Sequence, residues 1–330
     1  MAEVSQRAPD ASGNDRPVIG VDLGGTLIRA ALSNRRGEIV DRREIRTLAD
    51  EGVSAVLDRI IGLVEALHEQ SPGVSAVGIG CPGPLDSRSG VVYSPPAFPG
   101  WHDVPLARMV QERTGILSSV GNDANVAALG EFEYGAGRGV RHLVYITVST
   151  GVGGGVIVDG LLLEGRRGFA GEIGHTILEP EGPLCGCGGR GHVEALASGT
   201  AIARQAREAL DGGRESIIGE IAGDEGVTAR TVAEAAERGD ELGRELIRIA
   251  GHWLGYAMIN MVHLFNPQVI VIGGGVSQSG ELLLEPMRET LFDGLMPVFG
   301  EDLRIVPPGL GVDAGLYGAV ALARRTAGAS

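Results

Sequence analysis

The sequence contains one pattern twice: a short apolar strand, a glycine-rich turn and a second strand. The first copy runs through residues 18–33 and turns at Gly24, Gly25 and Thr26, and the second runs through residues 143–158 with a turn predicted over residues 149–155. A strand follows the glycines in both copies, whereas a dinucleotide-binding Rossmann motif needs a helix there. We interpret the repeated pattern as an internal duplication.

Other segments alternate between helical and strand patterns. Apolar residues recur at helical spacing over residues 53–70, and the long stretch from Leu242 to Leu264 is predicted as a helix that Asn266-Pro267 ends. We expect further strands over residues 75–80 and 269–272 and a C-terminal helix from Ala314 to Arg325. This alternation is typical of an α/β fold.

The composition excludes several kinds of phosphate chemistry. All 28 basic residues of the Lys+Arg count are arginines, so the chain has no lysine. A Walker A loop, the protein-kinase strand lysine and Schiff-base catalysis all require lysine. The 54 glycines follow no collagen period, and we assign them to turns and close backbone approaches.

Charge and cysteine content indicate the compartment and the partners. The net charge of −14 makes nucleic acid an unfavourable partner. We find neither a signal peptide nor an apolar run long enough to cross a membrane, and three cysteines are too few for a disulfide scaffold. We expect a soluble cytoplasmic protein that binds neither nucleic acid nor membrane.

The glycine turns are candidate phosphate-binding loops. Successive backbone N–H groups in such turns form anion nests that need no lysine. Asp22 precedes the first turn and could hold Mg²⁺ directly or through water. A third glycine run, Gly273, Gly274 and Gly275, follows the strand at residues 269–272. The alternative is that Gly24 and Gly25 form an ordinary tight hairpin beside a turn aspartate.

Asp123 has two interpretations. It follows Asn122 and precedes a helical run from Ala124 to Tyr134. It could be a helix N-cap and nothing more, which local sequence favours. It could instead accept the proton of a substrate hydroxyl in phosphoryl transfer.

A second group of polar residues has the composition of a metal site. His175, Cys185, Cys187 and His192 offer two nitrogens and two sulfurs, a closed tetrahedral set for Zn²⁺. The spacing is not that of a zinc finger, and the alternative is two reduced thiols in a flexible loop. Glu172 and Glu194 flank the set and could bind a polyol, although most glutamates are simply surface acids.

These motifs, in this order, resemble the ROK family of sugar kinases and sugar-responsive repressors from about Val18 to about Ala323. Each motif is weak alone, but the ordered set is specific. The segments that match are Asp22–Thr26, Asn122–Asn125, Ser149–Gly155, Gly171–His175, Cys185–Gly188 and Ala197–Gly199.

The resemblance implies an actin/hexokinase-like, ribonuclease H-like α/β fold of two domains around an interdomain cleft. We expect a tail over residues 1–16 and a smaller domain over 17–120, completed by the helix 314–330. We expect a larger domain over 121–313 that contains a zinc-binding segment, residues 175–192. The resemblance also implies ATP-dependent transfer to the 6-hydroxyl of a hexose, with glucose favoured and ATP, Mg²⁺ and structural Zn²⁺ as cofactors.

The resemblance assigns roles residue by residue. Asp123 matches the catalytic base, and the sugar ligands match Asn122, Asp123, Glu172, His175 and Glu194. The phosphate and nucleotide loops match Asp22, Gly24, Gly25, Thr26, Thr150, Gly151, Gly273, Gly274 and Gly275. The zinc ligands match His175, Cys185 and Cys187.

Two positions depart from the family pattern. His192 stands where the family has a third zinc cysteine, and Ala97 stands where many members have a polar residue in a loop that borders the sugar. Fructose, mannose or an N-acetylhexosamine are therefore alternative substrates. A non-catalytic sugar-responsive regulator is a further alternative, although only 17 residues precede Val18. We expect a homodimer or a homotetramer.

Overall fold

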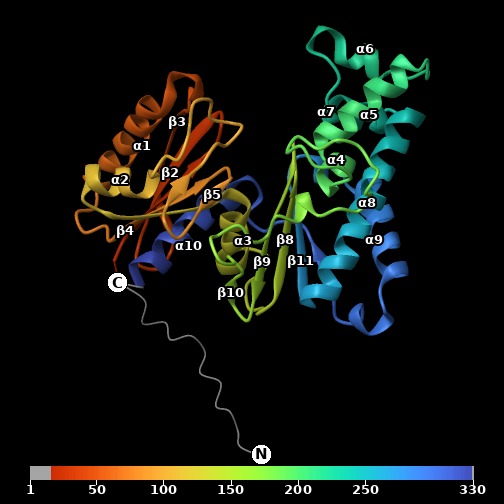
Figure 1. The fold of residues 1–330 in the computed structure, drawn as a ribbon. Coiled ribbons are helices and arrows are strands. Elements are labelled where there is room, and N and C mark those ends of the chain that lie inside the picture. The colour runs from red at the N-terminus through yellow and green to blue at the C-terminus, as the bar shows by residue number, and fades with distance from the viewer. Residues whose placement is uncertain (1–15, 329–330) are drawn as a thin grey trace, which may run out of the picture. The chain divides into compact units, whose positions relative to one another are not determined.

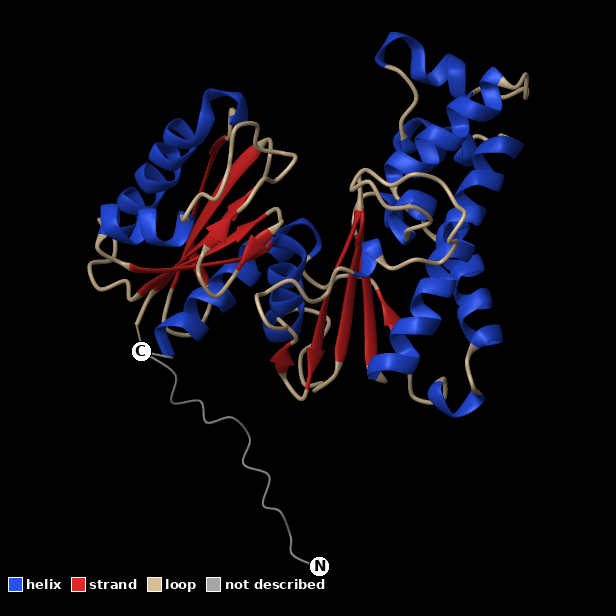
Figure 2. Ribbon diagram, viewed as in Figure 1, coloured by secondary structure: helices blue, strands red, loops and turns tan. Residues whose placement is uncertain are grey.

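The computed structural model describes residues 16–328, so the predicted tail falls almost wholly outside the described part. The described chain forms two compact units. The first comprises the residues up to Glu133, the segment Glu164–Phe169 and the residues from Asp313 onward; the second comprises Tyr134–Leu163 and Ala170–Val312. Each unit contains one five-stranded sheet (Figures 1 and 2).

The sheet of the first unit has the order β3-β2-β1-β4-β7. Strands β1, β2 and β3 are antiparallel neighbours, while β4 and β7 run parallel to β1. Helices α1 and α2 cover one face and α10 covers the other (Figure 1). The bounds are β1 Val18–Leu23, β2 Leu27–Ser33, β3 Ile39–Arg46, β4 Ala76–Cys81, β5 Leu85–Asp86, β6 Val91–Val92, β7 Leu117–Asn122, η1 Ala49–Glu51, α1 Gly52–His68, α2 Leu106–Thr114, α3 Asp123–Tyr134 and α10 Ala314–Gly328.

The sheet of the second unit repeats this plan with the order β10-β9-β8-β11-β12. Again three antiparallel strands precede two parallel ones, as an internal duplication predicts. The bounds are β8 Leu143–Val148, β9 Val152–Val158, β10 Leu161–Leu162, β11 Val269–Gly273, β12 Arg304–Val306, α4 Val193–Ala197, α5 Gly199–Asp211, α6 Ile218–Ala222, α7 Ala229–Glu237, α8 Glu241–Phe265, α9 Glu281–Gly294, η2 Ile173–His175, η3 Gly223–Glu225, η4 Val276–Ser279, η5 Pro297–Phe299 and η6 Gly311–Asp313, of which η6 begins in the second unit and ends in the first.

The second glycine turn is shorter than predicted. The prediction of a turn over residues 149–155 was wrong at its end, because β9 begins at Val152 and includes three of the glycines. Side-chain packing explains the difference: a Cβ at Gly154 would lie 2.5 Å from Ile173 Cδ1. Gly154 therefore serves close packing on the strand rather than the turn itself.

Close packing of helices also explains two glycines of the first unit. Helix α10 lies so near the sheet that a Cβ at Gly20 would be 2.6 Å from the backbone nitrogen of Val320. Helix α3 packs on α10 as well, because a Cβ at Gly130 would be 2.8 Å from the backbone nitrogen of Gly318. Most of α3 thus belongs to the first unit, although the sequence analysis drew a boundary before it, after residue 120.

No described helix is both long enough and apolar enough to cross a lipid bilayer.

Candidate active site

Asn122 and Asp123 lie where β7 ends and α3 begins. The Asn122 Oδ1 atom accepts hydrogen bonds from the backbone N–H groups of Ala124 at 3.0 Å and Asn125 at 3.2 Å. Asn122 is therefore the N-cap, and Asp123 is the first helical residue, with an exposed side chain. The interpretation of Asp123 as the N-cap was wrong, because the side chain of the preceding residue, Asn122, occupies that position.

The parallel strands of the first sheet bring a second carboxylate to the same edge. Asp22 pairs in register with Gly80 on β4, and Cys81 pairs with Asn122 on β7. The negative charges of Asp123 and Asp22 both act on Cys81, although burial is the main cause that raises the pKa of this thiol well above its usual range. Asp22 and Asp123 therefore flank one buried position at the carboxyl ends of β1, β4 and β7.

Asp22 forms an ion pair across the hairpin with Arg29 on β2. Arg29 donates from Nε at 3.0 Å and from a terminal guanidinium nitrogen, and both bonds end on Oδ2. The other carboxylate oxygen, Oδ1, accepts neither of these bonds. This donor chemistry fits a magnesium ion bound through water, because Mg²⁺ takes oxygen ligands and retains part of its hydration shell.

The first glycine turn is held by backbone groups and one threonine. Gly24 N–H donates to Leu27 O at 3.0 Å, and Thr47 Oγ1 donates to Gly24 O at 2.6 Å. A Cβ at Gly25 would lie 3.2 Å from the Ala97 Cβ. Ala97, which departs from the family pattern, therefore contacts the first glycine turn. Thr47 was not predicted, since nothing in its local sequence marks it.

In the second unit, the four residues of the predicted metal site come together. One ligand atom from each of His175, Cys185, Cys187 and His192 lies within 4.8 Å of every other. His175 Nδ1 is 3.8 Å from Cys185 Sγ, and His192 Nδ1 is 3.3 Å from Cys187 Sγ. Bonds of about 2.0–2.3 Å from a tetrahedral zinc ion place its ligands at roughly such separations. The residues therefore fit zinc.

Glycine makes this metal-ligand loop possible. Gly188 N–H donates to Cys185 O at 2.9 Å in a tight turn, and Gly188 has a φ of +93°, which side chains rarely adopt. A Cβ at Gly189 would overlap the His192 ring. Within the described residues, the turn thus returns His192 to the two cysteines as predicted.

His175 joins the metal cluster to the acidic residues. Its Nδ1 faces Cys185, while its Nε2 lies 3.9 Å from Glu172 Oε2. Burial raises the pKa of Glu172, and the charge of Glu194 adds to this rise while His175 opposes it. Burial likewise raises the pKa of the Cys185 thiol to about 11. One imidazole can therefore bind a metal through one nitrogen and a substrate hydroxyl through the other.

Glu194 contacts the second glycine turn. It lies in the first turn of α4, and its Oε2 accepts the Val152 N–H at 3.1 Å. A Cβ at Gly151 would overlap the same oxygen. The turn is held from another side by the start of α5, where Gly199 N–H donates to Ser149 O at 2.8 Å. Ala197–Gly199 is one of the segments that match the family, but its contact with the second turn was not predicted.

The third glycine run lies beside the second turn. Gly274 has a φ of +93°, and a Cβ there would lie against Val148 of β8. Gly275 N–H donates to Ser149 Oγ at 3.2 Å. Two of the three predicted nucleotide loops, the second glycine turn and the run from Gly273 to Gly275, therefore lie beside each other in the second unit.

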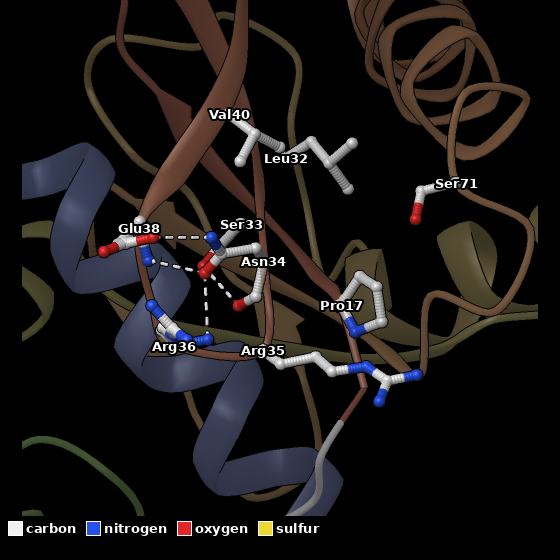
Figure 3. A pocket seen from close by; sticks show the side chains of 9 residues that line it. All are labelled: Pro17, Leu32, Ser33, Asn34, Arg35, Arg36, Glu38, Val40 and Ser71. Carbon is white, nitrogen blue, oxygen red and sulfur yellow. Dashed lines mark hydrogen bonds between the residues drawn. The ribbon is translucent and has the colours of Figure 1, made fainter.

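A cavity of about 380 Å³ lies elsewhere in the first unit, at the turn between β2 and β3 (Figure 3). Asn34 is one of its polar lining residues, and the Asn34 Oδ1 atom accepts hydrogen bonds from Arg36 N–H at 2.8 Å and Glu38 N–H at 3.1 Å. That side chain thus stabilises the turn. None of the predicted site residues lines this cavity.

Comparison with known proteins places the chain in a family. The model of the ROK family matches residues 18–326. A glucokinase of Thermotoga maritima is 41% identical over 314 residues, which cover 94% of this chain and 98% of that protein. The chain therefore belongs to the ROK family.

Solved structures agree with this assignment. The ROK hexokinase of Thermus thermophilus superposes with a TM-score of 0.80 at 36% identity, covering 93% of this chain and 97% of that one. A ROK family glucokinase from Streptomyces griseus, solved in complex with glucose and AMPPNP, has a TM-score of 0.78 at 36% identity and covers 94% and 99%. The fold is thus the actin/hexokinase-like α/β fold of the ROK hexokinases.

Proposed function

We propose that this protein is an ATP-dependent hexose kinase that transfers the γ-phosphoryl group of ATP to the 6-hydroxyl of glucose. The observation that carries the proposal is the exposed Asp123 carboxylate at the first position of α3, whose N-cap is occupied by Asn122. The similar glucokinases, one of them bound to glucose and AMPPNP, support glucose and ATP as substrates.

Asp123 orients the 6-hydroxyl and accepts its proton. The helix N-terminus stabilises the carboxylate form, as does the Ala124 N–H that donates to Asp123 Oδ1 at 2.8 Å. Such a carboxylate is a weak base. It suits phosphoryl transfer through a loose transition state, because the proton leaves the nucleophile late.

The phosphates of ATP bind to the glycine turns. The backbone N–H groups come from Gly25, Thr26, Thr150 and Gly151, while Gly24, whose N–H donates to Leu27 O, closes the first turn. Asp22 would hold Mg²⁺ through Oδ1 or a bound water. The run from Gly273 to Gly275 lies against the second turn and receives the adenosine. These groups stabilise the charge on the transferring phosphoryl group without a lysine.

The sugar hydroxyls bind Asn122, Glu172, His175 and Glu194. His175, Cys185, Cys187 and His192 would hold a structural zinc ion, and the bond from His175 to that metal would fix the orientation of its ring. Metal binding would therefore order the metal-ligand loop and, through His175, also orient a sugar ligand.

A coupled assay for ADP release over a panel of sugars tests the proposal. Glucose should give the highest kcat/KM among glucose, fructose, mannose, N-acetylglucosamine and N-acetylmannosamine. A higher value for another sugar would reassign the substrate within the same reaction. ADP release that no sugar stimulates would remove the kinase assignment and favour a sugar-responsive regulator. The net charge of −14 opposes the DNA-binding form of that alternative.

We also propose self-association as a homodimer or homotetramer in the cytoplasm. Large apolar side chains that are exposed on α8, on α9 and near η5 are the candidates for a contact with a second copy. They are Tyr256, Leu264, Phe292, Met296 and Val298. The three free cysteines suit a reducing compartment. Light scattering on the purified protein gives the mass, and Leu264→Glu should lower it to that of one chain.

A further inference from the structure

The Glu194 carboxylate lies between the metal-ligand loop and the second glycine turn. This turn, residues 149–151 between β8 and β9, is called the phosphate turn below. Glu194 Oε2 accepts the Val152 N–H at 3.1 Å, and Glu194 Oε1 lies 3.4 Å from Cys185 Sγ. The two oxygens of one side chain therefore contact segments that are 42 and 9 residues away in the chain.

The phosphate turn fits closely around this carboxylate. Gly151 is the residue before the anchored amide, and a Cβ at Gly151 would overlap Glu194 Oε2. The start of the turn is fixed separately, since Thr200 Oγ1 donates to Thr150 O at 2.8 Å. Glu194 thus determines where the end of the turn lies, while α5 determines its start.

We propose that Glu194 is a positioning residue for the phosphate turn as well as a sugar ligand, so that sugar and nucleotide binding are coupled through this side chain. The proposal rests on the proposed function, because it takes Glu194 as a sugar ligand and Thr150-Gly151 as a phosphate-binding turn.

The coupling has a simple physical origin. Glu194 carries a negative charge next to a turn that must receive phosphates, so its orientation changes the electrostatic potential there. A sugar hydroxyl that donates to the carboxylate spreads this charge and restricts the side chain to one rotamer. The Val152 N–H then stays bonded to Glu194 Oε2, which holds the preceding residues, Thr150 and Gly151, in place for the nucleotide. Coupling free energies of this kind are reciprocal, so the nucleotide must strengthen sugar binding by the same factor.

Gly151→Ala tests the proposal from the side of the turn. The added methyl group displaces Glu194 without touching the other proposed sugar ligands. We expect the Kd for glucose, measured by calorimetry with no nucleotide present, to rise about tenfold, as loss of a charged hydrogen bond predicts. Gly219→Ala in α6 is the matched control, because a Cβ there meets nothing within 4 Å; its glucose Kd should stay within about twofold of the unchanged protein.

Substitutions of Glu194 test it from the other side. Glu194→Ala and Glu194→Gln both remove the negative charge, so their comparison isolates the hydrogen bond to Val152. Without sugar, Glu194→Ala should bind AMPPNP several-fold more weakly than Glu194→Gln, because only glutamine retains an oxygen that accepts the Val152 N–H. Zinc content and melting temperature are measured on each variant, so that loss of the metal or of the fold is recognised.

The outcomes separate this proposal from the proposed function. If the unchanged protein binds glucose and AMPPNP but Gly151→Ala leaves nucleotide-free glucose binding within twofold, the positioning role of Glu194 is wrong and the kinase assignment stands. The role is equally wrong if Glu194→Ala binds AMPPNP as tightly as Glu194→Gln does. If the unchanged protein binds neither ligand, the proposed function fails and this proposal fails with it.

Discussion

The two glycine turns of this protein occupy the same place in two sheets of the same strand order. The charged side chains beside the two turns, however, come from different elements. The first turn has its charged residues on its own strands, where Asp22 and Arg29 pair across β1 and β2. The second turn lies between β8 and β9, which contain no charged residue, and its carboxylate comes from Glu194 on α4.

The difference fits a duplicated turn whose backbone is retained while the side chains around it vary. Under the proposed function, the N–H groups that bind phosphate belong to the backbone in both copies. The first unit then carries the proposed base Asp123, the proposed sugar ligand Asn122 and the proposed magnesium ligand Asp22, while the second carries the other proposed sugar ligands and the proposed zinc ligands. Six substitutions at five positions sharpen the comparison between the two units.

The largest effect is expected from the base of the first unit. Asp123→Asn should lower kcat by roughly 10²–10⁴, the usual range for loss of a general base, and leave the Kd for glucose nearly unchanged. Stopped assays of ADP release and calorimetry of glucose binding measure the two quantities. A variant that retains more than about a tenth of kcat would remove Asp123 from the role of base.

The zinc loop of the second unit should affect binding rather than the chemical step. His192→Ala should lose zinc and weaken glucose binding, because His175 loses the metal that fixes its ring. His192→Cys should keep zinc and activity, since a thiolate restores the family's usual ligand. Elemental analysis of each purified variant gives the metal content. Full zinc in His192→Ala would exclude His192 from the ligand set.

The glycines near the two turns should differ in their effect on stability. Gly154→Ala places a methyl group 2.5 Å from Ile173 Cδ1 and should destabilise the protein by about 1–3 kcal/mol, as overpacking does. Gly25→Ala meets the Ala97 Cβ at 3.2 Å and the Ala97 backbone oxygen at 3.9 Å, and should change the free energy of unfolding by less than about 1 kcal/mol. Urea unfolding of both variants makes the comparison, and equal midpoints would contradict it.

The smallest effect concerns the helix caps. Helix α3 has a neutral cap, Asn122, whereas α8 is capped by Asp240, which accepts bonds from Gly243 N–H at 2.7 Å and Ile217 N–H at 3.0 Å. Burial alone would raise the pKa of Asp240, but the hydrogen bonds to its carboxylate outweigh burial and lower it.

A lowered pKa in the folded state means that Asp240 stabilises the protein above the unfolded pKa of about 4, and that this contribution is lost as the pH falls through the folded value. Asp240→Asn keeps a capping oxygen and should cost less than about 1 kcal/mol at neutral pH. The difference from the unchanged protein should shrink towards pH 3 in urea titrations. A difference independent of pH would show that the charge contributes nothing.

Much of the fold could be predicted from local patterns. Leu143–Val148 was predicted with its exact bounds, and the helix from Leu242 to Leu264 within one residue, because apolar periodicity and a following Asn-Pro mark such elements. The start of β9 could not be predicted. Glycine ordinarily signals a turn, and only the distant Ile173 side chain reveals that glycine is required on the strand.

The candidate site shows the same contrast between local patterns, which can be predicted, and distant contacts, which cannot. The residue types of the zinc loop could be predicted because its ligands lie within 18 residues of each other in the sequence. The contact between Glu194 and Val152 spans 42 residues and has no local signal. Asp123 shows the reverse case, since local reasoning favoured a cap and only the family resemblance indicated a base.

The central claim, that this protein transfers a phosphoryl group from ATP to the 6-hydroxyl of glucose, has one direct test. ADP release is measured with ATP and Mg²⁺ in the presence of either glucose or 6-deoxyglucose, which lacks only the acceptor oxygen. Glucose should stimulate ADP release, and 6-deoxyglucose should bind as a competitive inhibitor and leave release at the level without sugar. Equal stimulation by both sugars would contradict the account, because the phosphoryl group would then go to another acceptor.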